Sequence, residues 1–426
     1  MEKEDMISIR EYEDKKTEER GWTDAFSAAV TRMESEGGGT LVVPAGRYET
    51  FPIELKSNMT LYLESGAELV FIQRSEGFPV IRSEFEGRDS FVYMSCIYAK
   101  NAENVTLCGH GTVNGQGEYW WKHMRELPYG RPYLICFEHC KHVKILDVKL
   151  TMSPAWTVHP LYCEDLEVRG ISIRNPWNSP NTDGINPDGC QNVRIADCLV
   201  DVGDDCITLK SGTEETPEKQ PCENITITNC NLVHGHGGVV IGSEMSGGVR
   251  NVTITNCVFQ DTDRGIRVKT RRGRGGVMES VLVSNVMMER VLCPFVFNMY
   301  YQCGAQGTSY KEKTPHEADE TTPVIRNIFI QNCLVNDARA AAGFFYGLPE
   351  MPVENVSISD CRIRMMENSE GGQTAMMEDL PDMAGEGIFM RFAKNVSFRN
   401  VQVENYKNLS GAKEAWDLDE TVSVIR

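Results

Sequence analysis

The chain repeats one short pattern of apolar and polar positions along most of its length. A polar residue leads, apolar and polar residues alternate, and Asn or Asp followed by a small or apolar residue closes the segment. Alternation with β-branched residues predicts a short strand with one buried face. Clear copies include "NVTLCG" at 104, "HVKILDV" at 142, "DLEVRGI" at 165, "NVRIADC" at 192, "NITITNC" at 224, "NVTITNC" at 251, "SVLVSNV" at 280, "NIFIQNC" at 327 and "NVSISDC" at 355.

The spacing of these strands indicates how they assemble. After a first gap of 38 residues, successive copies start 23, 27, 32, 27 and 29 residues apart, with no helical pattern between them. That signature predicts an all-β parallel solenoid, in which each coil buries its apolar face against the next. Such a fold can be long, so the 426 residues do not require several globular cores.

The cysteines fit the same repeat. Without a secretion signal, most of the fifteen cysteines are predicted to be reduced thiols. Metal ligation is disfavoured because no CxxC pair occurs, and we predict no metal and no cofactor. A ladder of small buried side chains is expected instead from the cysteines that close the repeat unit, which are Cys198, Cys230, Cys257, Cys333 and Cys361.

The N-terminal part differs from the repeats. We predict a cap over residues 1–50 and a parallel β-helix catalytic domain over 51–426. Thr23 is a plausible N-cap, Gly37–Gly39 would end the helix, and a strand would follow over 40–48. A helix here would cover the open end of the solenoid core. Its predicted apolar face comprises Ala25, Phe26, Ala29, Val30 and Met33.

Four insertions interrupt the repeat, near 72–93, 114–134, 302–325 and 364–386. Loops that interrupt a regular solenoid often build its binding face. The insertions are therefore candidates for lining a substrate cleft.

Charge and composition narrow the partners. The formal net charge of -18 argues against nucleic acid or an anionic membrane as the main partner. The charged N-terminus has no apolar signal segment, and no run of eighteen apolar residues occurs. These features predict a cytoplasmic protein, in which the Asn-x-Ser/Thr triplets belong to the repeat and are not glycosylation sites.

Four short motifs in successive repeats carry the candidate chemistry. Asp183 and Asp204 are 21 residues apart, and 31 residues separate both Asp205 from His236 and His236 from Arg267. Each step is about one coil, so these residues are expected to form one column at strand spacings of roughly 4.8 Å. The motifs are "NTDGINPD", "VGDDCITLKSG", "HGHGGVVIGS" and "RGIRVKT".

Clustered carboxylates beside cations suit glycoside hydrolysis. One carboxylic acid protonates the leaving oxygen, and a second carboxylate attacks or activates water. Close carboxylates raise one another's pKa, which predicts that one stays protonated near neutral pH. Arg267 and Lys269 share one strand face, so they could bind the carboxylate of a uronic acid. The basic segment 263–276 is accordingly interpreted as a local electrostatic trap. Its later cations, Arg271, Arg272 and Arg274, fit a solvated loop at least as well.

These motifs resemble those of the polygalacturonases of glycoside hydrolase family 28. The family's hallmarks are Asn-Thr-Asp, Gly/Gln-Asp-Asp, Gly-His-Gly and Arg-Ile-Lys, in that order, on a right-handed parallel β-helix. They correspond here to residues 181–183, 203–205, 235–237 and 267–269, with Val268 as the one departure. The resemblance implies a right-handed parallel β-helix with an N-terminal capping helix, and a site that needs no metal.

The resemblance also implies an inverting mechanism and a role for each residue. Asp204 would be the general acid, while Asp183 and Asp205 would hold and activate water. His236 would tune the site or contact substrate, and Arg267 and Lys269 would bind a galacturonate carboxylate. Asp204 and Asp205 are neighbours, which an ideal strand would point to opposite faces. We therefore expect a bend at this point, eased by Gly203.

Further substrate contacts are less specific. Asn181 belongs to the first motif. Trp156 and His159 lie about one coil before Asp183 and would either contact the sugar or pack. Additional subsite candidates are Ser243 and Glu244, and either Tyr300 or Tyr301, because the family places a tyrosine near there.

The leading hypothesis is a glycoside hydrolase that releases galacturonic acid from the non-reducing end of pectin-derived oligosaccharides. Alternatives are a rhamnogalacturonan galacturonohydrolase, an endo-polygalacturonase, a pectate lyase or a non-catalytic carbohydrate-binding solenoid. The order of the motifs fits hydrolysis better than a lyase. A pure binding protein would not need acids clustered beside cations.

Overall fold

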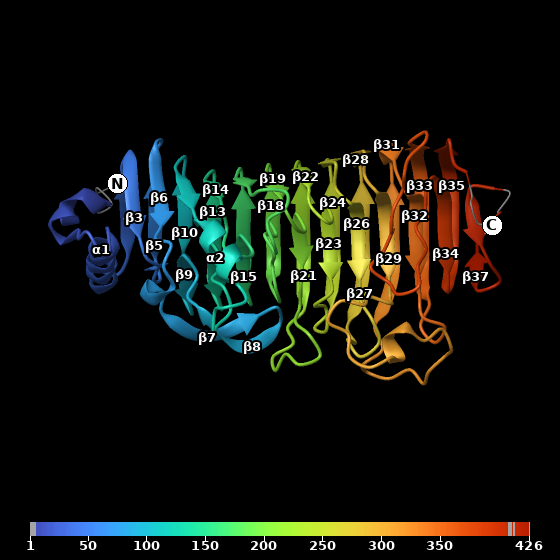
Figure 1. Cartoon of the computed structure of the whole chain (residues 1–426), viewed down its shortest axis with the longest axis horizontal. Helices are drawn as coiled ribbons and strands as arrows, with labels where there is room; N and C mark the ends of the chain where they lie inside the picture. The colour runs from blue at the N-terminus through green and yellow to red at the C-terminus, as the bar shows by residue number, and fades with distance from the viewer. Residues whose placement is uncertain (1–5, 408–410, 412–413, 426) are drawn as a thin grey trace. The chain divides into compact units, whose positions relative to one another are not determined.

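A computed structural model describes residues 6–407, 411 and 414–425. The chain forms two compact units, Met1–Asp204 (unit 1) and Asp205–Arg426 (unit 2). In each unit the chain winds in coils, and each coil contributes short strands to three parallel ladders, called here ladders 1, 2 and 3 (Figure 1). The predicted parallel β-helix is confirmed. None of the described helices is long and apolar enough to cross a membrane.

In unit 1, the strands of each ladder pair in parallel with their successors. Ladder 1 comprises β1 (Met6–Ser8), β2 (Gly39–Val43), β5 (Met59–Leu63), β10 (Thr106–Gly109), β13 (Lys141–Leu146), β16 (Glu164–Arg169) and β18 (Gln191–Ala196). Ladder 2 comprises β3 (Gly46–Thr50), β6 (Ala67–Phe71), β11 (Thr112–Asn114), β14 (Lys149–Thr151), β17 (Ser172–Arg174) and β19 (Leu199–Val202). Ladder 3 comprises β4 (Ile53–Glu54), β9 (Ile97–Lys100), β12 (Ile135–Glu138) and β15 (Val158–Leu161).

Unit 2 repeats this arrangement. Ladder 1 comprises β21 (Cys222–Thr228), β24 (Val249–Thr255), β27 (Val277–Ser284), β30 (Val324–Gln331), β33 (Val353–Met365), β35 (Ala393–Glu404) and β37 (Val422–Val424). Ladder 2 comprises β22 (Asn231–His234), β25 (Val258–Gln260), β28 (Met287–Glu289) and β31 (Leu334–Ala338), after which β33 continues it. Ladder 3 comprises β20 (Ile207–Leu209), β23 (Val239–Gly242), β26 (Arg264–Lys269), β29 (Cys293–Asn298), β32 (Ala341–Tyr346), β34 (Glu386–Arg391) and β36 (Trp416–Leu418).

The repeat pattern follows from the backbone of each coil. Asn224 and Asn251, which lead two copies, have φ of 59° and 58°, a left-handed conformation that Asn tolerates better than most residues. The side-chain amide of Asn251 donates to the side-chain oxygen of Asn224 at 3.0 Å. The leading polar residue thus makes the turn and links neighbouring coils, while the alternating apolar side chains fill the core.

The five predicted ladder cysteines are all buried, and their thiols are reduced as predicted. Within unit 2, Cys230 contacts Cys257 and Cys333 contacts Cys361 through their side chains. Unit 1 holds a further thiol column that the repeat alignment did not identify, formed by Cys140, Cys163 and Cys190.

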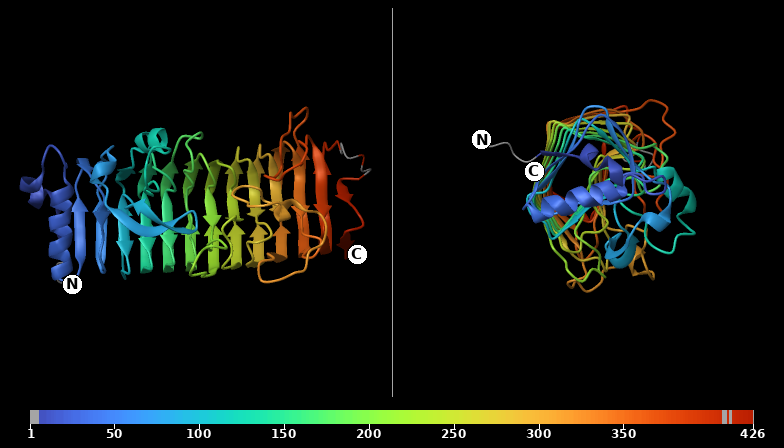
Figure 2. Two further views of the ribbon diagram at one scale, coloured as in Figure 1. Left: turned by 60° about the horizontal axis from the view of Figure 1, so that its bottom comes forward. Right: turned by 90° about the vertical axis from the view of Figure 1, so that its left-hand side faces the viewer.

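Helix α1 (Thr23–Ser35) forms as predicted and buries the expected apolar face. It contacts η1 (Ile9–Lys15), β2 and β4 (Figure 2). The N-cap prediction was wrong, because Trp22 occupies that position and the Thr23 hydroxyl accepts instead from the Phe51 backbone N–H at 3.0 Å. The capping role of α1 and the domain boundary at residue 50 stay predictions. Residues 1–5 and 426, at the outer ends of the two predicted ranges, lie outside the described residues.

The insertion near 72–93 contains η2 (Ser75–Gly77) and an antiparallel hairpin of β7 (Val80–Phe85) and β8 (Arg88–Tyr93). Ser83 donates to Glu138 at 3.0 Å, and the Tyr162 hydroxyl donates to Glu84 at 2.7 Å. The hairpin is therefore anchored beside ladder 3 of unit 1. Two other insertions contain short helices, α2 (Gly117–His123) and η3 (Ser309–Lys311).

Candidate active site

In unit 1, Asp183 is fixed at the C-terminal side of ladder 3. The Thr157 backbone N–H donates to the Asp183 carbonyl at 2.9 Å, which continues the β15 ladder by one coil. Its buried carboxylate accepts from the Asn186 side-chain amide at 3.0 Å. A carboxylate oxygen of Asp204, which is half-buried, lies within 4.8 Å of one of Asp183. The two predicted catalytic acids of unit 1 are thus brought together.

Arg131 positions the first motif, and the sequence analysis missed it. Its guanidinium donates to the Asn181 side-chain oxygen at 2.6 Å and to the carbonyls of Pro154 and Pro180 at 2.9 and 3.1 Å. Burial lowers the pKa of Arg131. The sequence shows Arg131 simply as an arginine within the 114–134 insertion. Its partners are 23 to 50 residues away in sequence, so no local pattern identifies them.

Trp156 and His159 lie in a buried aromatic cluster. The Trp156 ring stacks on Tyr133 with centroids 5.2 Å apart, and His159 meets both rings edge-on. His159 Nε2 lies 3.5 Å from a carboxylate oxygen of Asp188. With 4% and 1% of their surfaces exposed, these residues fit the packing alternative better than sugar stacking.

The chain bends after β19 at Gly203 and Asp204, where we expected a bend. Thr182 Oγ1 accepts from the Gly203 N–H at 3.3 Å. A Cβ at Gly203 would lie 2.5 Å from the Ser179 carbonyl oxygen, so glycine is needed here for close backbone approach. The bend leaves Asp204 half-buried while its neighbour Asp205 is buried.

In unit 2, Asp205 is bound by both cations of the fourth motif. Lys269 Nζ donates to Asp205 Oδ2 at 2.6 Å, and Arg267 Nη1 donates to Oδ1 at 3.2 Å. Burial alone would raise the pKa of Asp205, but Lys269 and Arg267 outweigh it and hold the pKa below its usual range. The expectation of mutually raised carboxylate pKa values is therefore wrong for Asp205, which is ionised at neutral pH.

Three further candidates of unit 2, His236, Tyr300 and Tyr301, lie in different environments. His236 is exposed, and its carbonyl accepts from Arg267 at 3.4 Å. Tyr301 lies beside Lys269, whose ammonium is 5.5 Å from the ring centroid. Tyr300 is buried against Tyr346, so Tyr301 is the better match for the tyrosine expected near Lys269.

Glu244 pairs with Lys210 at 2.8 Å, a partner that the sequence analysis did not select. Burial would raise the pKa of Glu244, but Lys210 and Arg274 together outweigh this effect and lower the pKa to about 2. Ser243 accepts from Arg274 at 3.3 Å. Both subsite candidates are thus held in a charged network.

The cations of segment 263–276 are mostly structural. Arg271 and Arg274 are buried and pair with Glu214, so the solvated-loop alternative was wrong for them. Arg272 is also buried; it pairs with Glu350 at 2.9 Å and donates to carbonyls of the 302–325 insertion. Arg264 donates to the carbonyls of Gln373 and Thr374 in the 364–386 insertion. The segment therefore fixes two insertions, and its charge is largely compensated.

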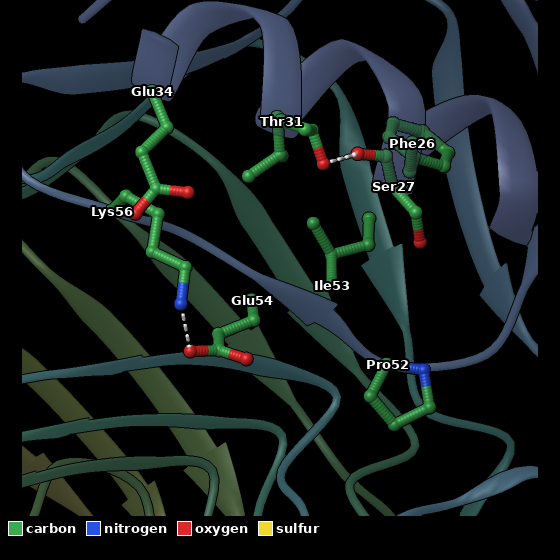
Figure 3. Close-up of a pocket in the computed structure, with 9 residues that line it drawn as sticks. Phe26, Ser27, Thr31, Glu34, Pro52, Ile53, Glu54 and Lys56 are labelled. Atoms are coloured by element: carbon green, nitrogen blue, oxygen red, sulfur yellow. Dashed lines mark hydrogen bonds and ion pairs between the residues drawn. The ribbon is translucent and has the colours of Figure 1, made fainter. Parts of the chain in front are cut away.

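A cavity of about 160 Å³ lies between α1 and residues 52–56 (Figure 3). Lys56 and Glu54 form an ion pair at its wall, and Thr31 donates to the Ser27 carbonyl within α1. None of the predicted catalytic residues lines this cavity, so we do not assign it to the active site.

A parallel β-helix with paired acids and a cation-bound carboxylate fits a carbohydrate-active hydrolase, and the comparisons identify the family. The family model described as "Glycosyl hydrolases family 28" matches residues 40–370, and the chain belongs to this family. The match contains all four motifs, and the resemblance stated from the motifs is confirmed.

Individual relatives agree with this assignment. A probable polygalacturonase of Vitis vinifera is 36% identical over 357 residues, which are 80% of this chain and 71% of that protein. A hyperthermoactive exopolygalacturonase from Thermotoga maritima is 28% identical, with a TM-score of 0.74 and coverage of 94% of this chain and 92% of that one. The family 28 exopolygalacturonase of Yersinia enterocolitica, at 18% identity, shares the fold with a TM-score of 0.80 over 99% of this chain and 78% of that one.

Proposed function

We propose that this glycoside hydrolase acts on pectin and releases galacturonic acid from the non-reducing end of galacturonide oligosaccharides. The observation that carries the proposal is the family match over residues 40–370, which contains the Asp, His and Arg-x-Lys motifs. Relatives named polygalacturonase support a galacturonan substrate.

In the proposed mechanism, Asp204 protonates the leaving glycosidic oxygen. Asp183 and Asp205 hold and activate the attacking water, and His236 tunes the site or contacts the substrate. The environment of Asp205 supports this division, because a carboxylate bound to Lys269 and Arg267 stays ionised and can hold the attacking water as a hydrogen-bond acceptor.

We further propose that Lys269 and Arg267 orient a galacturonate carboxylate. Lys269 carries three N–H donors, and its bond to Asp205 uses one of them. A shared ammonium would place the sugar acid beside the proposed base, which couples substrate recognition to catalysis.

Two similar solved structures are described as exopolygalacturonases, which supports exo action here. The anchored β7–β8 hairpin of unit 1 offers a physical means, since an insertion beside a cleft can block the path of a long polymer. Endo-polygalacturonase and rhamnogalacturonan galacturonohydrolase remain the alternative specificities. The cytoplasmic location remains a prediction, which cell fractionation would check.

The proposal is tested by incubating the protein with saturated tri-galacturonate and separating the products over time, with and without chelator. Galacturonate monomer appearing first, at a rate unaffected by chelator, supports the proposal. Internal cleavage of long chains would establish the endo alternative. An ultraviolet-absorbing unsaturated product would establish a lyase. Release of galacturonate only from rhamnogalacturonan fragments would transfer the proposal to that substrate.

A further inference from the structure

Ladder 3 of unit 2 continues past Lys269 as a row of aromatic and cationic side chains. In the parallel register Lys269 is followed by Asn298, Tyr346 and Arg391, one residue from each successive strand. The adjacent row in β32 and β34 holds Phe344 and Phe389. Because parallel strands lie roughly 4.8 Å apart, Tyr346 lies about two strand spacings from Lys269 along the ladder.

The two rows form an aromatic cluster. The Phe344 and Phe389 rings are stacked with centroids 5.4 Å apart, and Tyr346 lies 6.1 Å from Phe389 at 28°. Phe344 is fully buried, and the Arg391 guanidinium lies 4.0 Å from the Phe389 ring centroid, so the faces of the Phe389 ring are covered. Tyr346 is half-buried and continues the row of Lys269.

Lys313, from the 302–325 insertion, lies over this cluster. Its ammonium is 4.8 Å from the Tyr300 ring centroid and 4.6 Å from that of Tyr346. The residue is exposed, and it forms no ion pair with any of the described residues. Burial lowers the pKa of Lys313 against a smaller opposing effect of Asp379. Two rings hold the ammonium, and none of the carboxylates in the described part of the chain forms an ion pair with it.

The other cations near ladder 3 of unit 2 are compensated. Arg391 lies 3.0 Å from Asp417 and 2.9 Å from Asp419, and Lys311, two residues from Lys313, lies 2.6 Å from Glu378. The cations of segment 263–276 are paired as described above. Lys313 therefore stands apart as a cation available to an external anion.

We propose that Lys313, held over the ring of Tyr346, forms a subsite that binds the carboxylate of a uronic acid residue beyond the one held at Lys269. This inference rests on the proposed function and deepens it. The 302–325 insertion then acts as a specificity element that selects acidic oligosaccharides long enough to reach Lys313. Arg272 fixes the insertion in place through its bonds to the carbonyls of Ser309 and Glu312.

The test compares Lys313→Gln with Lys311→Gln, a matched loss of one charge from the same insertion. Both proteins and the wild type are assayed on di-, tri- and tetra-galacturonate. If the subsite exists, Lys313→Gln should lower kcat/KM by about 10-fold on tri- and tetra-galacturonate, and the loss should arise from a higher KM. On di-galacturonate the same variant should change kcat/KM little. Lys311→Gln should change neither, Lys313→Arg should restore most of the loss, and methyl-esterified oligomers should not distinguish Lys313→Gln from the wild type.

Binding separates failure of this inference from failure of the proposed function. Calorimetry with tetra-galacturonate on Asp204→Asn and on Asp204→Asn/Lys313→Gln measures the subsite without turnover. Weaker binding in the double variant supports the subsite whether or not the wild type hydrolyses these substrates. If binding is weaker but the wild type hydrolyses none of them, the proposed function fails and the subsite stands. The subsite would be overturned if loss of Lys313 changed neither binding nor rates. It would also be overturned if Lys313→Gln lowered kcat/KM equally at every chain length and lowered the melting temperature.

Discussion

The third ladders of the two units surround carboxylates with different neighbours. In unit 1 the carboxylates of Glu138 and Asp188 are buried, and Glu138 accepts from the Tyr98 hydroxyl and pairs with Lys100. Beside this ladder, Glu84 is half-buried and accepts from the Tyr162 hydroxyl. Burial raises the pKa of Glu84 to about 7. In unit 2 the buried carboxylate Asp205 is instead bound by two cations, and its pKa is lowered.

This difference shows that carboxylates on the same type of fold can favour different protonation states. Strand geometry places each side chain, but its neighbours decide whether a carboxylate holds or releases its proton. Acid–base hydrolysis needs one group of each kind. Glu84 in unit 1 and Asp205 in unit 2 represent the two environments, and the Asp204–Asp205 pair lies at the boundary between the units in sequence.

The largest effect is expected where the proposed acid is removed. Asp204→Asn should lower hydrolysis by roughly 10²–10⁴-fold, because the amide cannot protonate the leaving oxygen. Rates of galacturonate release measure the loss. Calorimetric binding of tri-galacturonate and an unchanged melting temperature are the controls, and a variant with near wild-type turnover would remove Asp204 from the mechanism.

A second variant tests whether the cations of unit 2 are structural. Arg272→Ala leaves Glu350 buried without its partner and frees the 302–325 insertion, so the free energy of unfolding should fall by about 3–5 kcal/mol. Urea unfolding and proteolysis within the insertion report the effect. The control is Arg362→Ala, whose ion pair with Glu404 is exposed and should contribute no more than about 1 kcal/mol. Equal losses in both variants would contradict the anchoring role.

The third prediction concerns the ionisation of Asp205. Lys269→Gln removes the nearer cation, which raises the pKa of Asp205. Activity that needs the ionised carboxylate should then be lost at a higher pH, so the acidic limb of the kcat/KM profile moves upward. The rate at the optimum should fall roughly 10²-fold. A lower rate with an unmoved acidic limb would mean that Lys269 serves substrate binding alone.

The smallest effect is expected at Glu84 in unit 1. Its pKa is about 7 in the folded protein against an ordinary value of 4.5, so the folded state favours the protonated form. The stability that this provides is present below pH 4.5 and is lost as the pH rises through 7. Glu84→Gln should therefore match the wild type at pH 4 and be more stable by about 1–3 kcal/mol at pH 8.

Urea unfolding at the two pH values measures this difference. Glu76→Gln, an exposed carboxylate in the same insertion, is the control. A Glu84→Gln variant with the same pH dependence as the wild type would show that burial does not perturb Glu84.

Local sequence was enough to predict the solenoid, because each coil carries its own alternation and its turn-forming Asn. The bend at Gly203 was predictable for the same reason. The charge network was not: Arg271, Arg272 and Arg274 find Glu214 and Glu350 across 57 to 78 residues of sequence. A pattern of local charge does not identify such partners, so structural arginines resembled a substrate trap.

Arg131 and Lys313 escaped notice for a related reason. Both belong to insertions outside the repeat, where no periodicity indicates which way a side chain points. The antiparallel β7–β8 hairpin is a further example, since its partners in ladder 3 are 55 to 78 residues away in sequence. The three candidate acids, by contrast, belong to motifs at coil spacing that the sequence shows directly, and their catalytic role stays a prediction.

The anomeric configuration of the first product tests the central claim most directly. Carboxylates that lie close together are typical of retaining enzymes and wider spacing is typical of inverting ones, and oxygens of Asp183 and Asp204 lie within 4.8 Å. The account nevertheless predicts inversion, because Asp183 and Asp205 activate water and form no bond to the sugar. Proton NMR during the first minutes of tri-galacturonate hydrolysis should show the anomer opposite to that of the cleaved linkage. The retained anomer would contradict the account and would make one of these aspartates a nucleophile.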